Sequence, residues 1–326
     1  MTPLQHWHDA VNAAAGTLNQ SECPPYTTAL EYSEFFSAAH HCHMYLKHEH
    51  MQHTGSFKYR GALHKILSLS EHERQKGIVT ASSGNHGMAC ALAAQRLNIS
   101  ASVYVPETAS GFKLAQISRL GADVVPVAGD CLAAELSAQT IANEQDKTYI
   151  SPYNDAEVIA GQGTIAVELL QQLPDIDAVF VAVGGGGLIS GIGSYLKAEH
   201  PHIDVIGCWP ANAPAMAKCL GAGKIIDVAE NDTLSDGTAG NVEPNAITFQ
   251  ICQKVIDKHV FIDERQIATV ITQMAQHERQ IVEGAAAVAI AGALKLSHDY
   301  AHKKVAVIVC GRNIAFEKLQ AILTPR

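Results

Sequence analysis

Short apolar runs rich in β-branched residues alternate with helix-length amphipathic segments along most of this chain. Between 77 and 148, each of three such runs is followed by a helix-length stretch: 78–81 then 85–97, 101–105 then 111–120, and 124–127 then 131–145. The pattern returns at 179–183, 187–199, 205–208 and 305–310. Strands that alternate with helices form parallel sheets covered on both faces. The sequence therefore predicts an α/β fold.

The length of the chain and the character of two runs refine this expectation. At about 150 residues per domain, 326 residues predict roughly two domains. No repeat, low-complexity segment or Pro/Ser-rich linker divides them, so we expect a compact boundary. VFVAV at 179–183 and VAVIV at 305–309 are apolar throughout, which is typical of strands buried on both faces at a sheet centre. The region 264–298 has mainly helical periodicity.

Composition excludes several classes of protein and partner. Hydrophobic residues make up 47% of the chain and charged residues 17%, which excludes disordered, collagen-like and coiled-coil chains. The formal net charge of -9 repels a phosphate backbone, so we expect no nucleic-acid partner.

The N-terminus and the cysteines predict a cytoplasmic protein without a membrane partner. Residues 1–16 show no secretory signal pattern. The uncharged segment 178–196 contains a glycine run that would break a spanning helix. The eight cysteines contain no C-x-x-C pair, which favours reduced thiols. They are Cys23, Cys42, Cys90, Cys131, Cys208, Cys219, Cys252 and Cys310.

Four consecutive glycines, 184–187, follow the run VFVAV and precede the helix-like LISGIGSYLK. Residues without side chains let backbone N–H groups close on an anion at a helix N-terminus. A plain tight turn does not need four glycines, each of which costs about 0.5–1 kcal/mol relative to Ala. No G-x-G-x-x-G or G-x-x-x-x-G-K-[ST] motif is present, so the run favours a phosphate group over a nucleotide.

Two further segments carry polar chemistry. Lys58 lies in TGSFKYRGA (54–62), among small and aromatic residues; a lysine in an apolar pocket has a lowered pKa and attacks aldehydes. Taken alone, this motif favours a solvated lysine at a helix start over a nucleophile. The run SSGNHG (82–87) leaves one apolar run and opens a helix, which makes a cradle for a carboxylate. Simple helix capping by Ser83 or Asn85 explains part of that run.

Together these segments resemble the fold-type II pyridoxal-phosphate enzymes, in the threonine/serine dehydratase and serine racemase branch. The resemblance covers nearly the whole chain. It rests on six motifs in order: GSFKYRGA (55–62), SSGNHG (82–87), AGQGT (160–164), GGGGL (184–188), SDG (235–237) and VCGRN (309–313).

The resemblance implies a tryptophan synthase β-like fold of two open parallel-sheet domains, with pyridoxal 5'-phosphate in the cleft between them. The larger, cofactor-binding domain is expected at 1–76 plus 149–326, and the smaller inserted domain at 77–148. A homodimer is also implied.

The resemblance further implies roles for individual residues in holding the cofactor. Lys58 would bind it covalently, Phe57 would pack near its ring and Asn85 would donate to its phenolic oxygen. The loop Gly184, Gly185, Gly186, Gly187 and Leu188 would hold its 5'-phosphate. Cys310 would face the pyridine nitrogen, where relatives often have Ser. A neutral thiol there favours prompt β-elimination, although Cys310 is equally a small core residue at a strand end.

For the amino-acid substrate, the resemblance implies that Ser82, Ser83, Asn85 and His86 bind the carboxylate through side-chain and backbone donors. Ser83 matches the serine that exchanges a proton opposite the lysine in racemases. Lys58 and Ser83 are thus the expected catalytic residues.

The implied activity is a dehydratase (ammonia-lyase) that converts L-serine, L-threonine or a related 3-hydroxy amino acid to a 2-oxo acid and ammonia. Serine racemase activity, alone or alongside elimination, is the alternative. Dehydration of 3-hydroxyaspartate and a non-catalytic cofactor- or metal-binding protein rank below both.

Three departures from the family pattern stand out. The stretch 208–215 lacks the carboxylates of the metal site common in this branch, so we expect no metal there. Arg312 replaces a usual glycine and could attract a second carboxylate. Histidines crowd the segment before Lys58, where three of them could in principle bind zinc but most are expected at the polar surface. They are His40, His41, His43, His48, His50 and His53.

Overall fold

The computed structural model describes residues 3–109, 111–129 and 131–324 and contains two sheets with helices packed on them. The smaller sheet has the strand order β5-β4-β3-β6, and every neighbouring pair in it is parallel. Its strands are β3 (Ile78–Ala81), β4 (Ala101–Pro106), β5 (Asp123–Val127) and β6 (Thr148–Tyr149). Its helices are α4 (Glu71–Lys76), α5 (Asn85–Arg96), α6 (Gly111–Arg119) and α7 (Cys131–Glu144).

The larger sheet has the order β1-β2-β10-β7-β8-β9, and only the β1–β2 pair is antiparallel. Its strands come from both ends of the chain: β1 (Leu30–Tyr32), β2 (His43–Lys47), β7 (Ala178–Ala182), β8 (Asp204–Pro210), β9 (Lys258–Ile262) and β10 (Lys304–Ile308). The predicted α/β fold with two parallel-sheet domains is therefore confirmed. The domain limits at 77 and 148 stay a prediction.

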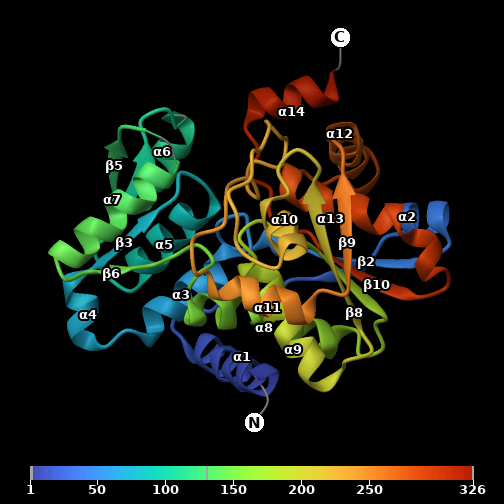
Figure 1. The fold of residues 1–326 in the computed structure, drawn as a ribbon, viewed down its shortest axis with the longest axis horizontal. Coiled ribbons are helices and arrows are strands. Elements are labelled where there is room, and N and C mark those ends of the chain that lie inside the picture. The colour runs from blue at the N-terminus through green and yellow to red at the C-terminus, as the bar shows by residue number, and fades with distance from the viewer. Residues whose placement is uncertain (1–2, 110, 130, 325–326) are drawn as a thin grey trace.

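Ten helices of the described chain accompany the larger sheet or join the two sheets. They are α1 (Pro3–Gln20), α2 (Glu34–His40), α3 (Lys58–Ser68), α8 (Ala156–Gln172), α9 (Gly187–Glu199), α10 (Ala215–Ala222), α11 (Ile247–Val255), α12 (Glu264–Gln273), α13 (Gly284–Lys295) and α14 (Phe316–Leu323). Short 3-10 turns lie at Glu49–Met51 and Ser297–Tyr300, and a π-helical turn at Met274–Glu278. In Figure 1 the smaller sheet lies on the left and the larger on the right, with α3 and α8 between them.

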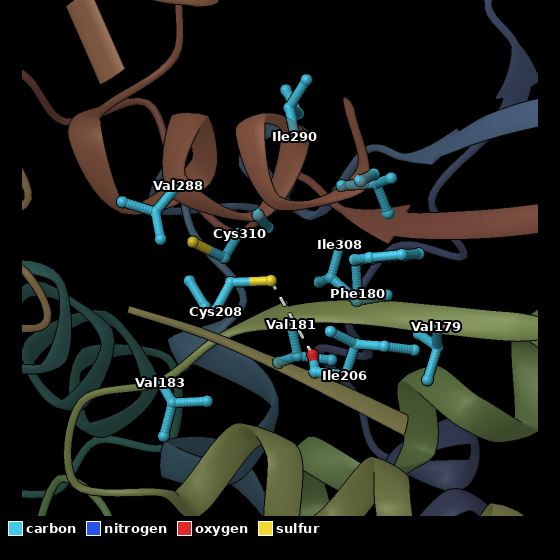
Figure 2. Close-up of a cluster of buried hydrophobic side chains, with 14 of the residues drawn as sticks. Val179, Phe180, Val181, Val183, Ile206, Cys208, Val288, Ile290, Ile308 and Cys310 are labelled. Carbon is cyan, nitrogen blue, oxygen red and sulfur yellow. Dashed lines mark hydrogen bonds between the residues drawn. The ribbon is translucent and has the colours of Figure 1, made fainter. Parts of the chain in front are cut away.

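The core of the larger sheet explains why its central strands are apolar throughout. Every residue of β7 is buried, as expected for a strand covered on both faces. Helix α13 packs on this sheet, and its first ten residues, mostly alanine, are all buried. Its small side chains let the helix approach closely, since a Cβ at Gly292 would lie 2.4 Å from the Cys208 sulfur. Figure 2 shows residues of β7 and α13 in this shared core.

The parallel strands place the chain segments that carry chemistry. In open α/β sheets, ligands bind beyond the carboxyl ends of the strands. The residues after β3, β7 and β10 are 82–87, 183–187 and 309–313. The first loop follows a strand of the smaller sheet, and the other two follow strands of the larger sheet. Residues of all three loops line one cavity.

No helix among the described residues is both long enough and apolar enough to cross a membrane. Seven of the cysteines are free thiols, and the side chain of the eighth, Cys131, lies outside the described part of the chain.

Candidate active site

A cavity of about 1710 Å³ lies between the two sheets, at the carboxyl ends of their strands. Its lining includes every residue that the sequence predicted for the cofactor or the substrate: Phe57, Lys58, Ser82, Ser83, Asn85, His86, Gly184, Gly185, Gly186, Gly187, Leu188 and Cys310. These residues lie up to 253 positions apart in the chain, from 57 to 310, and the fold brings them together in one cavity. The individual roles remain predictions.

Lys58 is the first residue of α3, and its amine is held in the cavity wall. Its Nζ donates a 2.7 Å hydrogen bond to the carbonyl of Pro152 and lies 5.2 Å from the centre of the Phe57 ring. Burial lowers the pKa of this amine to about 8, and the nearby Cys90, Cys310 and Glu283 only partly oppose that effect. A neutral amine, which is the nucleophilic form, is therefore accessible near neutral pH.

Buried ion pairs fix the helix turn that carries Lys58. The Arg60 guanidinium donates to both oxygens of Glu49 at 2.8 Å and to Glu168 at 2.6 Å, and Lys47 donates to Glu168 at 2.6 Å. Arg60, Glu49 and Lys47 are each at most 1% exposed. No local sequence pattern predicts this network, because its members lie on β2, on the 3-10 turn that follows it, on α3 and on α8.

The glycine loop has no room for side chains. A Cβ at Gly185 would lie 2.4 Å from the ring of Tyr153, and one at Gly187 would lie 3.0 Å from the same residue. Gly186 has φ +88°, and a Cβ there would lie 2.9 Å from the Cys252 sulfur. Because α9 begins at Gly187, its free N–H groups join those of the loop. The loop is built as a backbone cradle for an anion.

The loop after β3 turns tightly into α5. Ser82 Oγ accepts a 3.2 Å hydrogen bond from the N–H of Gly84, and a Cβ at Gly87 would lie 2.2 Å from the Ser82 carbonyl oxygen. His86 is 2% exposed, and its Nε2 lies 3.1 Å from the carbonyl oxygen of Ile150. Burial lowers the pKa of His86 to about 3, so its ring is neutral and engaged with Ile150. For a bound carboxylate, the backbone of His86 is therefore the available donor.

The side chain of Asn85 is held by two residues that the sequence analysis did not select as site residues. Its Nδ2 donates to Glu283 at 2.8 and 3.1 Å, and its Oδ1 accepts from Asn313 Nδ2 at 2.6 Å. A signal was present, since Glu283 is the charged residue directly before the apolar helix α13.

Cys310 follows β10 and keeps its proton. Burial raises the pKa of this thiol well above its ordinary value, and the charge of Glu283 raises it further. Its carbonyl oxygen accepts a 3.0 Å hydrogen bond from the N–H of Phe57, so the strand end is tied to the turn that carries Lys58. Figure 2 shows Cys310 in the same core as Cys208.

The expectation that most of the crowded histidines lie at the surface is wrong for two of them. His48 is 3% and His50 1% exposed, and burial lowers the pKa of His50 to about 4. Neutral imidazole is polar but uncharged, which lets the His50 ring pack inside. Burial also lowers the pKa of His48, and the Glu31 carboxylate at 2.9 Å from its Nε2 opposes that effect. The side chain of His40 lies outside the described residues.

Arg312 lines the cavity, and its Nη1 lies 3.1 Å from the sulfur of Met51. In the part of the chain that the structure describes, no three His, Cys, Asp or Glu side chains gather closely enough to hold a metal ion. After β8, the carboxylate of Glu230 accepts hydrogen bonds from the N–H groups of Ala215 and Gly240 at 3.0 and 2.7 Å.

Comparison with known proteins agrees with this geometry. Residues 24–311 match the family model described as "Pyridoxal-phosphate dependent enzyme". The chain is 40% identical over 296 residues to an L-threonine ammonia-lyase of Thermotoga maritima, which covers 91% of this chain and 73% of that protein.

Two solved structures are similar over nearly the whole fold. The processed form of threonine deaminase isoform 2 from Solanum lycopersicum superposes with a TM-score of 0.92 at 34% identity, covering 99% of this chain and 94% of that one. A serine racemase from Dictyostelium discoideum superposes with a TM-score of 0.86 at 31% identity, covering 94% and 98%. The chain belongs to the family of pyridoxal-phosphate dependent enzymes, and pyridoxal phosphate is its cofactor.

Proposed function

We propose that this protein is a pyridoxal-phosphate dependent ammonia-lyase that converts L-threonine or L-serine to a 2-oxo acid and ammonia. The observation that carries the proposal is the position of Lys58, whose pKa is lowered to about 8, in one cavity with the glycine loop and the Ser82–His86 turn. The similarity to a threonine ammonia-lyase and a threonine deaminase supports the substrate class.

The residues present fit the cofactor. The side-chain-free loop 184–187 offers backbone N–H groups to a 5'-phosphate, and any Cβ at Gly184 or Gly187 would approach neighbouring atoms to 3.0 Å. The low-pKa amine of Lys58 suits covalent attachment to an aldehyde. Phe57 and the neutral thiol of Cys310 lie in the same cavity, where they would contact the ring and its nitrogen.

Pyridoxal phosphate, when bound, supplies the electron sink that makes the Cα proton of an amino acid acidic. The protein's own groups then decide the outcome. We propose that Lys58 takes the Cα proton and that Asn85 and the N–H groups of the Ser82–His86 turn hold the substrate carboxylate and the ring. The neutral Cys310 thiol does not supply the charge that would keep the ring nitrogen protonated, which favours loss of the β-hydroxyl.

Serine racemisation is the second candidate, and the presence of Ser83 in the cavity lining favours it. A hydroxyl on the face opposite Lys58 would return a proton to the other side of Cα. The similarity to a serine racemase structure supports the same candidate.

One assay tests both proposals. The holoenzyme is incubated with L-threonine, L-serine and 3-hydroxyaspartate, and ammonia, 2-oxo acid and D-serine are measured. Ammonia and 2-oxo acid from threonine or serine support the lyase, whereas D-serine without ammonia supports the racemase. Ser83→Ala should abolish D-serine formation and leave elimination from the L-substrate intact. Equal loss of both would mean that Ser83 positions the substrate.

We further propose that the protein works as a homodimer in the cytoplasm. The family resemblance supports the dimer, and the free thiols of the described cysteines support a reducing compartment. Sedimentation equilibrium of the holoenzyme and fractionation of the source cells test the two statements.

A further inference from the structure

A buried carboxylate reaches across from the larger sheet to the first residue of α5. Glu283 directly precedes α13, and both of its oxygens accept hydrogen bonds from Asn85 Nδ2, at 2.8 and 3.1 Å. Its Oε2 also accepts from the backbone N–H of Asn313 at 2.9 Å. Glu283 is 5% exposed, so water screens its charge little.

These contacts fix the Asn85 amide in one of its two orientations. A carboxylate only accepts hydrogen bonds, so Glu283 requires the nitrogen of Asn85 on its side. On the other side, Oδ1 of Asn85 accepts from Asn313 Nδ2, which also donates to the Thr54 carbonyl oxygen at 2.9 Å. A flipped Asn85 would put its oxygen against the carboxylate. Both contacts of Nδ2 go to one carboxylate, so a single N–H shared between its two oxygens accounts for them and the second N–H remains a donor.

The carboxylate has little freedom to move. The backbone N–H of Glu283 donates to the Gly311 carbonyl oxygen at 3.0 Å. A Cβ at Gly311 would lie only 2.4 Å from Glu283 Oε1. The carboxylate is therefore packed against the same strand end that carries Cys310, and its charge raises the pKa of both Cys310 and Lys58 while burial is the larger effect on each.

We propose that Glu283 is a positioning residue, which orients the Asn85 amide so that an N–H group faces the ring oxygen of the cofactor. Glu283 itself acts through Asn85. The inference rests on the proposed placement of the cofactor beside Asn85, and it is independent of which amino acid the enzyme converts.

The substitution Glu283→Gln tests the orientation. Glutamine offers one oxygen and one NH₂ group where Asn85 Nδ2 and the Asn313 N–H both need acceptors. Flipping Asn85 relieves that conflict but turns its oxygen toward the cofactor. We expect the dissociation constant for pyridoxal phosphate, measured by equilibrium dialysis of the apoprotein, to rise about tenfold.

A double-mutant cycle separates positioning from a merely structural role. In the Asn85→Ala background there is no amide to orient, so Glu283→Gln should change the cofactor dissociation constant by less than about twofold. Glu283→Gln should change the melting temperature of the apoprotein both in the parent protein and in the Asn85→Ala background. An equal loss of cofactor affinity in both backgrounds would overturn the proposal.

Glu264→Gln is the matched control. Glu264 is also a carboxylate at the start of a helix, and its Oε2 accepts a backbone N–H from Leu234 at 2.6 Å. Its removal should leave cofactor affinity unchanged. If Glu283→Gln yields no folded apoprotein, Asn313→Ala removes the other hydrogen bond to the Asn85 amide and goes through the same cycle, with the same expected and contrary results.

The two proposals fail in different ways. Cofactor binding needs no substrate, so a holoenzyme without ammonia-lyase activity still gives the cycle its readout. If Asn85→Ala itself leaves the cofactor affinity unchanged, the placement of Asn85 beside the cofactor is wrong and the positioning role falls with it. That outcome would not count against the proposed ammonia-lyase activity, which is tested separately by ammonia release from threonine.

Discussion

Arg60, which lies two residues after Lys58, forms a bidentate ion pair with Glu49, and both hydrogen bonds are 2.8 Å long. Both side chains are at most 1% exposed. The pair joins the first turn of α3 to the segment after β2, so the position of the proposed catalytic lysine depends on charges buried behind it.

Arg60→Met should strongly destabilise the protein, because it leaves the buried Glu49 carboxylate without its cation. Removing one partner of a buried ion pair costs about 3–5 kcal/mol in the free energy of unfolding. Urea unfolding followed by circular dichroism measures this. Lys304→Met, which removes the exposed ion pair with Asp175, is the control and should leave the unfolding midpoint nearly unchanged. Equal midpoints for both variants would contradict the account.

Gly185→Ala should weaken cofactor binding by about tenfold or more, since its Cβ would lie 2.4 Å from the Tyr153 ring and force the phosphate loop to shift. Cofactor affinity is measured on the purified apoprotein. Gly16 in α1 has open space around it, so Gly16→Ala should leave affinity unchanged and stabilise the helix slightly. Unchanged cofactor affinity in Gly185→Ala would show that this loop does not hold the phosphate.

The rate at which the apoprotein takes up pyridoxal phosphate should rise with pH through about 8. The reacting form of Lys58 is the neutral amine, and a base with a lowered pKa loses its proton at lower pH than usual. Stopped-flow absorbance between pH 6 and 11 measures the profile. A rate that rises only above pH 10, as for an exposed lysine, would show that Lys58 is not the attacking group.

Turnover and thermal melting should be unaffected by chelator or by added Mg²⁺. The end of β8 and the segment after it carry no carboxylate at 208–215, and the Glu230 carboxylate accepts hydrogen bonds from the N–H groups of Ala215 and Gly240. Mg²⁺ requires a near-octahedral shell of oxygen ligands. A ligand that binds only the native state would raise the melting temperature. A rise of several degrees with Mg²⁺, or inactivation by chelator, would reveal a metal site that this account lacks.

Much of the fold could be predicted from local patterns. The strands β3, β4, β7 and β10 consist mostly of buried apolar residues, and the helices that follow the first three of them lie where the sequence predicts them. The strand β6 has two residues and β1 three, so neither carries a readable pattern. The strand β2, HMYLK, contains a buried lysine whose amine donates to Glu168, which lies 121 positions away.

Some residues of the candidate site could likewise be predicted from local sequence patterns, and others could not. Lys58, the Ser82–His86 turn and the glycine loop could be predicted, because each is a contiguous motif with its own chemistry. The contacts of Pro152, Tyr153 and Glu283 could not, since each depends on how two distant segments pack. The buried histidines show the same limit, because the sequence does not tell a neutral core imidazole from a solvated one.

Chemical labelling maps the residue that bonds the cofactor. The native holoenzyme is reduced with borohydride and digested, and the peptides are sequenced by mass spectrometry. We expect the phosphopyridoxyl group on Lys58. The variant Lys58→Ala should lose both the label and ammonia release from L-threonine, while its far-ultraviolet circular dichroism stays unchanged. A label on another lysine, or undiminished ammonia release from Lys58→Ala, would contradict this expectation.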